Sequence, residues 1–138
     1  MNTQPLQINF GDCPCTQGKQ LVTVYPLNEE SIEANIPDGV MPANYRIGRL
    51  IAQSYFVIYV GRVDYRQDRG LKDRMLEHLG EFTGDCYFEW NSASSPLAAY
   101  KRECQDYHCW GQYGHLLNKI HPRKPDGYSL TMCPVCGQ

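Results

Sequence analysis

The sequence lacks any long hydrophobic run. No stretch approaches the roughly 20 consecutive apolar residues that a membrane-spanning helix needs. The opening residues, MNTQPLQINF, also lack the basic-then-apolar pattern of an export signal. Internal repeats and low-complexity segments are missing too, which excludes a repeat architecture. These absences predict a soluble protein of the cytoplasm that has no membrane partner.

The sequence also lacks a strong net charge. Its 13 basic and 15 acidic side chains give −2, whereas a simple nucleic-acid clamp is normally basic. The charges are nevertheless unevenly placed. Residues 1–40 carry one lysine and five acidic side chains, and residues 44–74 carry seven basic and three acidic ones. The second segment indicates either an anion-binding face or an ordinary solvated charged surface.

Hydrophobic periodicity predicts a single α+β domain. A chain of 138 residues is long enough to bury a real core but too short for two full domains. Alternating segments predict strands, apolar residues at helical spacing predict helices, and Gly- or Pro-rich segments separate them. The expected strands are 5–10, 20–25, 45–51, 55–60 and 83–90, and the expected helices are 70–79 and 97–109.

These elements suggest three parts. Residues 1–43 are expected to form a β-hairpin followed by a linker, in which Pro37 allows at most a short helix. Residues 44–122 are expected to form the core, a small three-stranded antiparallel sheet flanked by helices. Residues 123–138 show little periodicity, so only a ligand network or a metal would hold them against the core.

One stretch, Tyr55 to His78, organises the core. Its apolar run predicts a buried strand that ends at Gly61, where a backbone without a side chain lets another group approach closely. An arginine-rich loop and a helix follow. This order favours an anion site, and the predicted substrate-binding residues are Gly61, Arg62, Arg69 and Lys72.

Several short motifs then follow in a particular order. They are Val57-Ile58-Tyr59-Val60-Gly61-Arg62, Leu71-Lys72-Asp73-Arg74, His78, Glu103 and Asn118-Lys119. In this order and spacing the chain, from about Tyr45 to Pro122, resembles the GIY-YIG endonuclease family, which includes the incision domain of bacterial excision repair. The resemblance implies a small domain with a three-stranded antiparallel sheet that cleaves phosphodiesters with one divalent metal.

The resemblance also implies roles for individual residues. It predicts a catalytic set of Tyr45, Tyr59, Arg74, His78, Glu103 and Asn118, with Glu103 as the ligand of magnesium or manganese. The first motif departs from the family pattern, because it reads Ala43-Asn44-Tyr45 without the glycine and isoleucine. Tyr45 also lies 14 residues before Tyr59, a little further than is usual.

These residue types suit phosphodiester hydrolysis on chemical grounds as well. The reaction needs an activated water and stabilisation of the charge that grows on the phosphate. Arg74 could neutralise that charge through its guanidinium, and Glu103 could hold a hard cation that prefers oxygen ligands. A tyrosine has a pKa of about 10 and needs a neighbouring cation or metal-bound water to act as a base. Tyr59 is the favoured base, with Tyr45 or His78 assisting.

The cysteines predict a second site. Cys133-Pro-Val-Cys136-Gly is typical of half a structural zinc site, because two intervening residues let both sulfurs reach one ion. Cys104 and His108 lie one turn apart on the expected helix and could complete it. His121 could replace either of them, and Cys13 with Cys15 is a rival pair. Cys86 and Cys109 are expected to be buried free thiols, since a reducing compartment disfavours disulfides.

Two functions fit this pattern. The first is a metal-dependent endonuclease acting on DNA, with magnesium or manganese in the active site and a structural zinc. The second is a non-catalytic, zinc-containing module that binds nucleic acid or protein. The sequence leaves open the choice between DNA and RNA, the sequence specificity and the oligomeric state.

Overall fold

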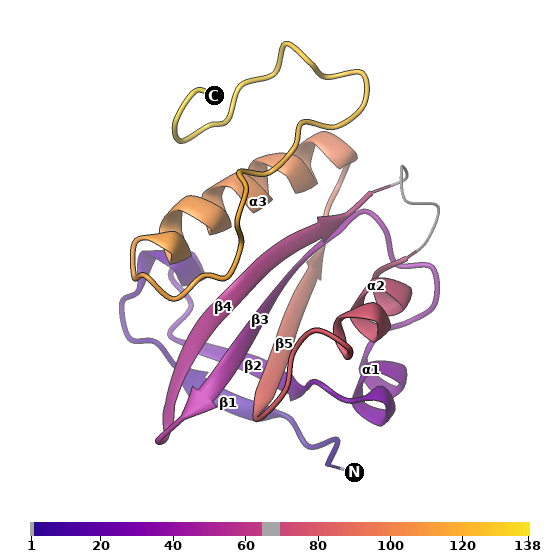
Figure 1. Cartoon of the computed structure of the whole chain (residues 1–138), viewed down its shortest axis with the longest axis vertical. Helices are drawn as coiled ribbons and strands as arrows, with labels where there is room; N and C mark the ends of the chain where they lie inside the picture. Colours follow the sequence, from indigo (N-terminus) through magenta and orange to yellow (C-terminus); the bar gives the residue numbers. More distant parts are fainter. Residues whose placement is uncertain (1, 65–69) are drawn as a thin grey trace.

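Five antiparallel strands form one sheet in the order β1-β2-β5-β3-β4. The computed structural model describes residues 2–64 and 70–138, and within them three α-helices and a 3-10 turn accompany the sheet (Figure 1). The α+β class is therefore confirmed. The elements are β1 Leu6–Asn9, η1 Pro14–Thr16, β2 Leu21–Pro26, α1 Glu29–Asn35, β3 Ala43–Ile51, β4 Ser54–Val63, α2 Leu71–His78, β5 Cys86–Ser92 and α3 Pro96–Gly111.

The sheet is larger than the sequence predicted. The expected N-terminal hairpin exists as β1 and β2, but Tyr25 and Pro26 of β2 also pair with Phe88 and Tyr87 of β5. The prediction of a three-stranded sheet with an appended hairpin is thus wrong, because the hairpin extends the sheet to five strands. A pairing between segments so far apart in the chain leaves no trace in local alternation.

Strand β3 lies at the centre of the functional half of the sheet. It pairs with β4 on one side and with β5 on the other, and its first six residues are buried. Tyr45 of β3 stands opposite Gly61 of β4. A Cβ atom at Gly61 would overlap the Tyr45 ring, so the glycine leaves the space that this ring occupies.

The helices cover both faces of the sheet. Ile32 of α1 and Leu71 of α2 belong to one apolar core together with Ile47 and Tyr59. On the other face, Val60 packs with Trp110 of α3, because neighbouring strand residues point to opposite sides. Segment 28–43 therefore contributes core residues rather than serving as a free linker.

Local signals fix the helix ends. The Ser95 side chain accepts a hydrogen bond from the Ala98 backbone N–H at 3.0 Å, with Pro96 in the first turn, as the sequence predicted for this helix. Asn28 caps α1 in the same way through Ser31. No helix among the described residues is long and apolar enough to cross a membrane.

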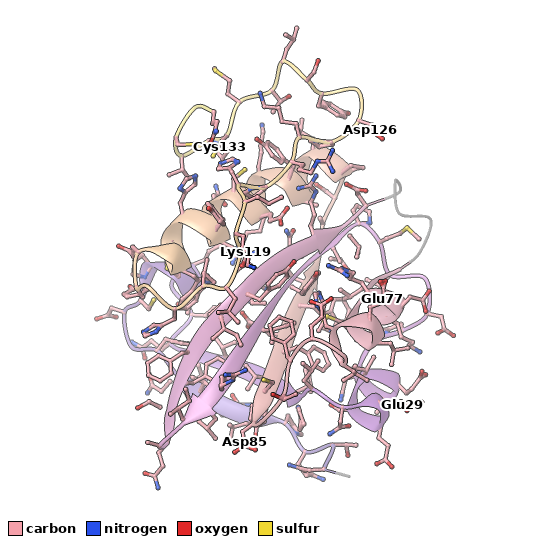
Figure 2. The ribbon with its side chains drawn as sticks, in the orientation of Figure 1. Glu29, Glu77, Asp85, Lys119, Asp126 and Cys133 are labelled. Carbon is pink, nitrogen blue, oxygen red and sulfur yellow. A yellow bond between two sulfur atoms is a disulfide. The ribbon has the colours of Figure 1, made fainter. Side chains whose placement is uncertain are left out.

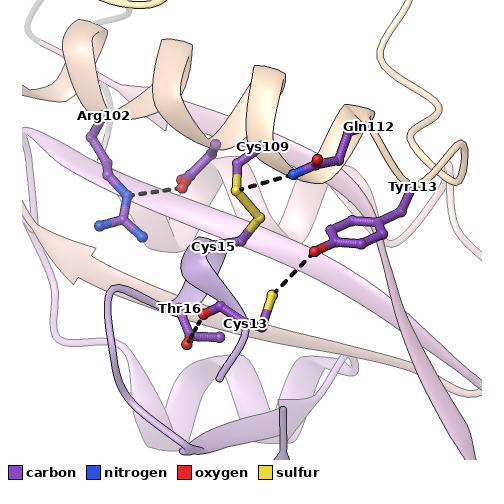
Figure 3. Close-up of a disulfide and its surroundings, with 8 residues drawn as sticks. Cys13, Cys15, Thr16, Arg102, Cys109, Gln112 and Tyr113 are labelled. Carbon is purple, nitrogen blue, oxygen red and sulfur yellow. Dashed lines mark hydrogen bonds and ion pairs between the residues drawn. A yellow bond between two sulfur atoms is a disulfide. The ribbon is translucent and has the colours of Figure 1, made fainter. Parts of the chain in front are cut away.

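A disulfide joins Cys15 of η1 to Cys109 of α3 (Figure 3). The expectation that Cys109 is a free thiol is therefore wrong. Cys86 is a buried free cysteine, as expected. The bridge ties the N-terminal hairpin to the last turns of α3. Beyond α3, residues 112–138 form no helix or strand and run past β4 and back over α3 (Figure 1).

Candidate active site and metal centre

A pocket of about 290 Å³ lies where the C-terminal segment crosses β4. Residues from β3, β4, α2, α3 and the C-terminal segment line it. The lining brings together five of the six side chains predicted as catalytic, which are Tyr45, Tyr59, Arg74, Glu103 and Asn118. Gly61 and Arg62, two of the predicted substrate-binding residues, line the same pocket.

His78, the sixth predicted catalytic residue, lies behind Tyr45 and does not line the pocket. It is fully buried, and its Nε2 atom lies 2.8 Å from the Tyr45 hydroxyl. Its Nδ1 atom lies 3.1 Å from an oxygen of Glu81. A carboxylate only accepts hydrogen bonds, so Nδ1 carries the proton and Nε2 accepts from the Tyr45 hydroxyl. No sequence motif pointed to Glu81, although residues three positions apart in a helical turn can contact one another.

Both His78 and Tyr45 are uncharged near pH 7, so a neutral phenol is hydrogen-bonded to a neutral imidazole. Burial lowers the pKa of His78, and the nearby Arg74 lowers it further, so the imidazole is neutral near pH 7. Burial raises the pKa of Tyr45 well above its usual value, followed by the effect of Tyr59, and Arg74 only partly opposes both. Tyr45 is therefore a phenol that donates to His78 and accepts from the Arg74 guanidinium, which leaves one lone pair of its oxygen to accept a further hydrogen bond.

Arg74 and Tyr59 complete this side of the pocket. Burial raises the pKa of Tyr59, and the Arg74 guanidinium opposes the rise. Arg74 is partly buried, its guanidinium donates hydrogen bonds to the hydroxyls of Tyr45 and Tyr59, and it forms an ion pair with Glu77 at 3.6 Å. The guanidinium therefore faces the pocket between two phenols, where it can meet an anionic ligand.

Glu103 projects from α3 into the opposite side of the pocket. Burial raises the pKa of Glu103 to about 7, against the lowering effect of Arg62. The Glu103 carboxylate accepts a hydrogen bond from the Arg62 guanidinium, which also contacts Asp64 and the backbone carbonyl of Arg123. This carboxylate is already paired with a cation in the described structure.

Arg62 is consequently more than a surface cation. It is only 8 % exposed, and its three partners fix the guanidinium within the fold. Arg46 is similarly buried and bonds to Glu89, Asp106 and Asn91. The basic segment 44–74 therefore does not form one continuous solvated face, since Arg46 and Arg62 are buried and paired with acidic side chains inside the protein.

Lys72, another predicted substrate-binding residue, lies elsewhere. Lys72 is on the surface of α2 and pairs with Asp38 at 2.8 Å and Glu33 at 3.3 Å, away from the residues that line the pocket. Its role in the structure is to join α2 to α1 and the loop after it. Arg69 falls outside the described residues.

Asn118 uses its side chain to bind the edge of the sheet. Its amide N–H donates to the Val60 carbonyl at 2.8 Å, and its amide oxygen accepts from the Val60 N–H at 3.0 Å. Leu117 adds a backbone hydrogen bond to Ile58. Both polar atoms of the Asn118 side chain are thus engaged with Val60, so Asn118 positions the pocket wall.

A second cluster lies next to the pocket, between α3 and the chain end. His108, His121, Cys133 and Cys136 each offer one ligand atom, and these atoms lie within 4.8 Å of one another. The group could hold a metal such as zinc. Figure 2 shows Cys133 in the C-terminal loop above α3.

The observed ligand group differs from the leading prediction at one position. His121 takes the place predicted for Cys104, which is one of the alternatives that the sequence left open. Cys104 is fully buried beside Cys133 and Tyr100, and burial raises its pKa to about 12, so it is a thiol. Cys13 and Cys15 do not belong to this group: Cys15 is in the disulfide, and Cys13 contacts Tyr113 at 3.7 Å (Figure 3).

The Cys133-Cys136 turn is shaped to favour a thiolate. The Val135 N–H points at the Cys133 sulfur at 3.4 Å, and the Gly137 N–H donates to the Cys133 carbonyl at 3.0 Å. Burial alone would raise the pKa of Cys133, but backbone N–H groups of Cys136 and Val135 outweigh it and lower the pKa to about 5. Gly137 has a φ of +76°, a conformation that glycine adopts without strain. The thiolate is the form that binds metals.

Comparisons of the chain with protein-family models, with curated proteins and with solved structures returned no match.

Proposed function

We propose that the chain is a metal-dependent endonuclease that hydrolyses phosphodiester bonds in DNA. The observation that carries the proposal is the convergence of two phenols, a guanidinium and a partly buried carboxylate on one pocket. These groups come from four separate elements. The pocket is large enough for a phosphate group and a hydrated cation beside it.

The donor set fits a divalent cation such as magnesium or manganese. Glu103 is a carboxylate with a raised pKa, so burial penalises its charged form, and a cation in the pocket would relieve that penalty. Magnesium requires few protein ligands, because it keeps several of its waters. Bound at Glu103, the cation would stabilise negative charge on the phosphate and on the departing oxygen.

Tyr45 is the proposed general base. As the water oxygen bonds to phosphorus, one water proton passes to the Tyr45 oxygen, and the Tyr45 hydroxyl proton passes to Nε2 of His78. Glu81 stabilises the resulting imidazolium through Nδ1. The bond from phosphorus to the leaving oxygen breaks, and this oxygen takes a proton from solvent. This assignment replaces Tyr59 as the favoured base, since only Tyr45 has a proton acceptor behind it among the described contacts.

Arg74 is proposed to bind the phosphate. Its guanidinium can donate two hydrogen bonds to a phosphate and neutralise the charge that develops there. Tyr59 lines the same part of the pocket and can donate a further hydrogen bond. The metal at His108, His121, Cys133 and Cys136 is proposed to be zinc, and four protein ligands give it a closed, structural site.

Cleavage of supercoiled plasmid with magnesium or manganese tests the proposal. The parent protein should nick the plasmid, and Glu103→Gln and Arg74→Ala should each lower the rate at least 100-fold. Glu29→Gln, a change of an exposed glutamate on α1, should leave it unaltered. Full activity in the Glu103 or Arg74 variant would refute the assignment.

One observation favours a non-catalytic binding module as the second candidate. The ion pair between Arg62 and Glu103 satisfies the carboxylate without a divalent cation. If that pair never opens, the pocket can bind a phosphate through Arg74 but cannot hold the cation. DNA binding that is unaffected by magnesium, with no nicking under any condition, would support this candidate.

A further inference from the structure

The wall of the pocket on the side of the C-terminal segment has no secondary structure of its own. Asn118, Ile120 and Arg123 all line the pocket, yet residues 112–138 contain no helix or strand. Hydrogen bonds from Leu117 and Asn118 to β4 hold one end of this wall. Arg62 holds the other end through the Arg123 carbonyl.

His121 sits between these two anchors and belongs to both sites. It lines the pocket, and it is one of the four side chains of the metal group. Its Nδ1 atom lies 3.0 Å from the Pro122 carbonyl, to which it donates. This bond fixes the tautomer and leaves Nε2 with a free lone pair, which is the usual arrangement of a metal-binding histidine.

The surroundings of Nε2 point independently to a metal. The Nε2 atom of His121 lies 3.2 Å from Nε2 of His108 and 3.5 Å from the sulfur of Cys136. A hydrogen bond between the two rings engages only these two nitrogens, whereas one cation can be bound by both nitrogens and by the two sulfurs, because all four atoms lie within 4.8 Å of one another.

We propose that zinc bound by His108, His121, Cys133 and Cys136 fixes the wall of the pocket and so makes the catalytic site competent. His121 is the positioning residue, since it alone among the four ligands also lines the pocket. This inference rests on the proposed nuclease function only for its effect on catalysis. Its structural part stands without it.

The packing of the segment explains why the metal is needed. Ile120, Leu130 and Met132 are at least 65 % exposed, so these large apolar side chains do not anchor the segment. Zinc would link three parts of the chain. It would bind the segment through His121, the chain end through Cys133 and Cys136, and α3 through His108. The disulfide to the neighbouring Cys109 anchors the same turn of α3 to η1.

Zinc content and amide hydrogen exchange test the proposal together. The parent protein should carry one zinc per chain, and Cys133→Ser/Cys136→Ser and His121→Ala should lose it. In both variants exchange at the Val60 amide, which is bonded to Asn118, should rise at least tenfold. Exchange at amides of the β3–β5 pairing should stay unchanged. Cys104→Ser, which alters the adjacent buried thiol, should keep both zinc and protection.

Hydrogen exchange of the parent protein with and without zinc provides a test that does not depend on whether the variants fold. Removal of zinc with a chelator should deprotect Val60, and adding zinc alone should restore protection. Zinc retained in the double cysteine variant, or zinc lost with Val60 still protected, would overturn the proposal. Glu103→Gln should keep zinc and protection, so failure of the nuclease proposal alone would leave this result intact.

Discussion

At the scale of single residues, Gly61 shows how one missing side chain creates the site. The Tyr45 ring fills the space that a Cβ at Gly61 would need. Gly61→Ala should therefore destabilise the protein by about 1–3 kcal/mol and displace the Tyr45 hydroxyl. Gly80→Ala is a matched control, because the nearest atom to its Cβ would be 3.8 Å away. Urea unfolding should separate the two variants, and equal stabilities would contradict the account.

The two pocket tyrosines should differ in their effect on rate. Tyr45→Phe removes the group that hands a proton to His78 and should lower nicking by about 100- to 10,000-fold. Tyr59→Phe removes only a hydrogen-bond donor to the phosphate and should cost less. Single-turnover rates with saturating protein measure both. A larger loss of rate in Tyr59→Phe than in Tyr45→Phe would indicate that Tyr59 is the general base.

Catalysis should also weaken in acid. His78 must be neutral to accept the proton, and its pKa in the folded protein is lowered by burial and by Arg74, against the raising effects of Glu81 and Glu77. At a saturating concentration of the divalent cation, which keeps the Glu103 carboxyl ionised despite its raised pKa, the rate should therefore persist below the ordinary histidine pKa of about 6.5 and fall as the pH drops through the lower, folded value. The contribution of His78 to stability should fall in the same window, because the unfolded chain binds that proton first, whereas the contribution of Glu103 should rise as the pH drops below about 7, because the folded chain binds its proton first. Rate and unfolding measurements from pH 5 to 8 test this, and a rate that rises in acid would contradict it.

At the scale of elements, the edge of β4 depends on one side chain. Asn118→Ala removes two hydrogen bonds to Val60 and should destabilise the pocket wall by about 1–3 kcal/mol. Exchange at the Val60 amide should rise while the β3 side of the sheet stays protected. If Val60 keeps its protection, another contact holds the wall.

The disulfide should stabilise the whole fold rather than the pocket alone. It links residues separated by 94 positions, so Cys15→Ser/Cys109→Ser should cost about 2–5 kcal/mol of unfolding free energy. Denaturant unfolding without reductant measures this loss. An unchanged midpoint would show that the hairpin packs onto α3 without the bridge.

Local sequence signals predicted most of these elements. Alternation located β3 and β4, and Ser95 with Pro96 located the start of α3, because capping and side-chain alternation act within a few residues. The β2–β5 pairing and the disulfide escaped prediction, since both join segments distant in the chain. The short helix in segment 28–43 was anticipated, but its burial was not.

In the whole molecule, only part of the candidate site could be predicted from the sequence. Motif order placed Tyr59, Arg74 and Glu103 in one site, and all three line one pocket. Side-chain direction could not be read in this way. The fold decides that Arg62 turns onto Glu103, that His78 stands behind Tyr45 and that His121 replaces Cys104 in the metal group.

In the whole molecule, two halves of the chain meet at one pocket. The sheet and α2 supply the phenols and Arg74, while α3 and the C-terminal segment supply Glu103 and the wall. The Arg62–Glu103 ion pair lies at the junction. Its opening by a divalent cation is what separates a nuclease from a binding module.

A crystal structure with manganese and a short DNA tests this most directly. The account predicts anomalous density for manganese at the Glu103 carboxylate at about 2.0–2.2 Å, the distance expected for a small hard cation. It also predicts a phosphate at Arg74 and the Arg62 guanidinium moved away from Glu103. A phosphate bound with no metal at Glu103, and with the Arg62 ion pair intact, would contradict it.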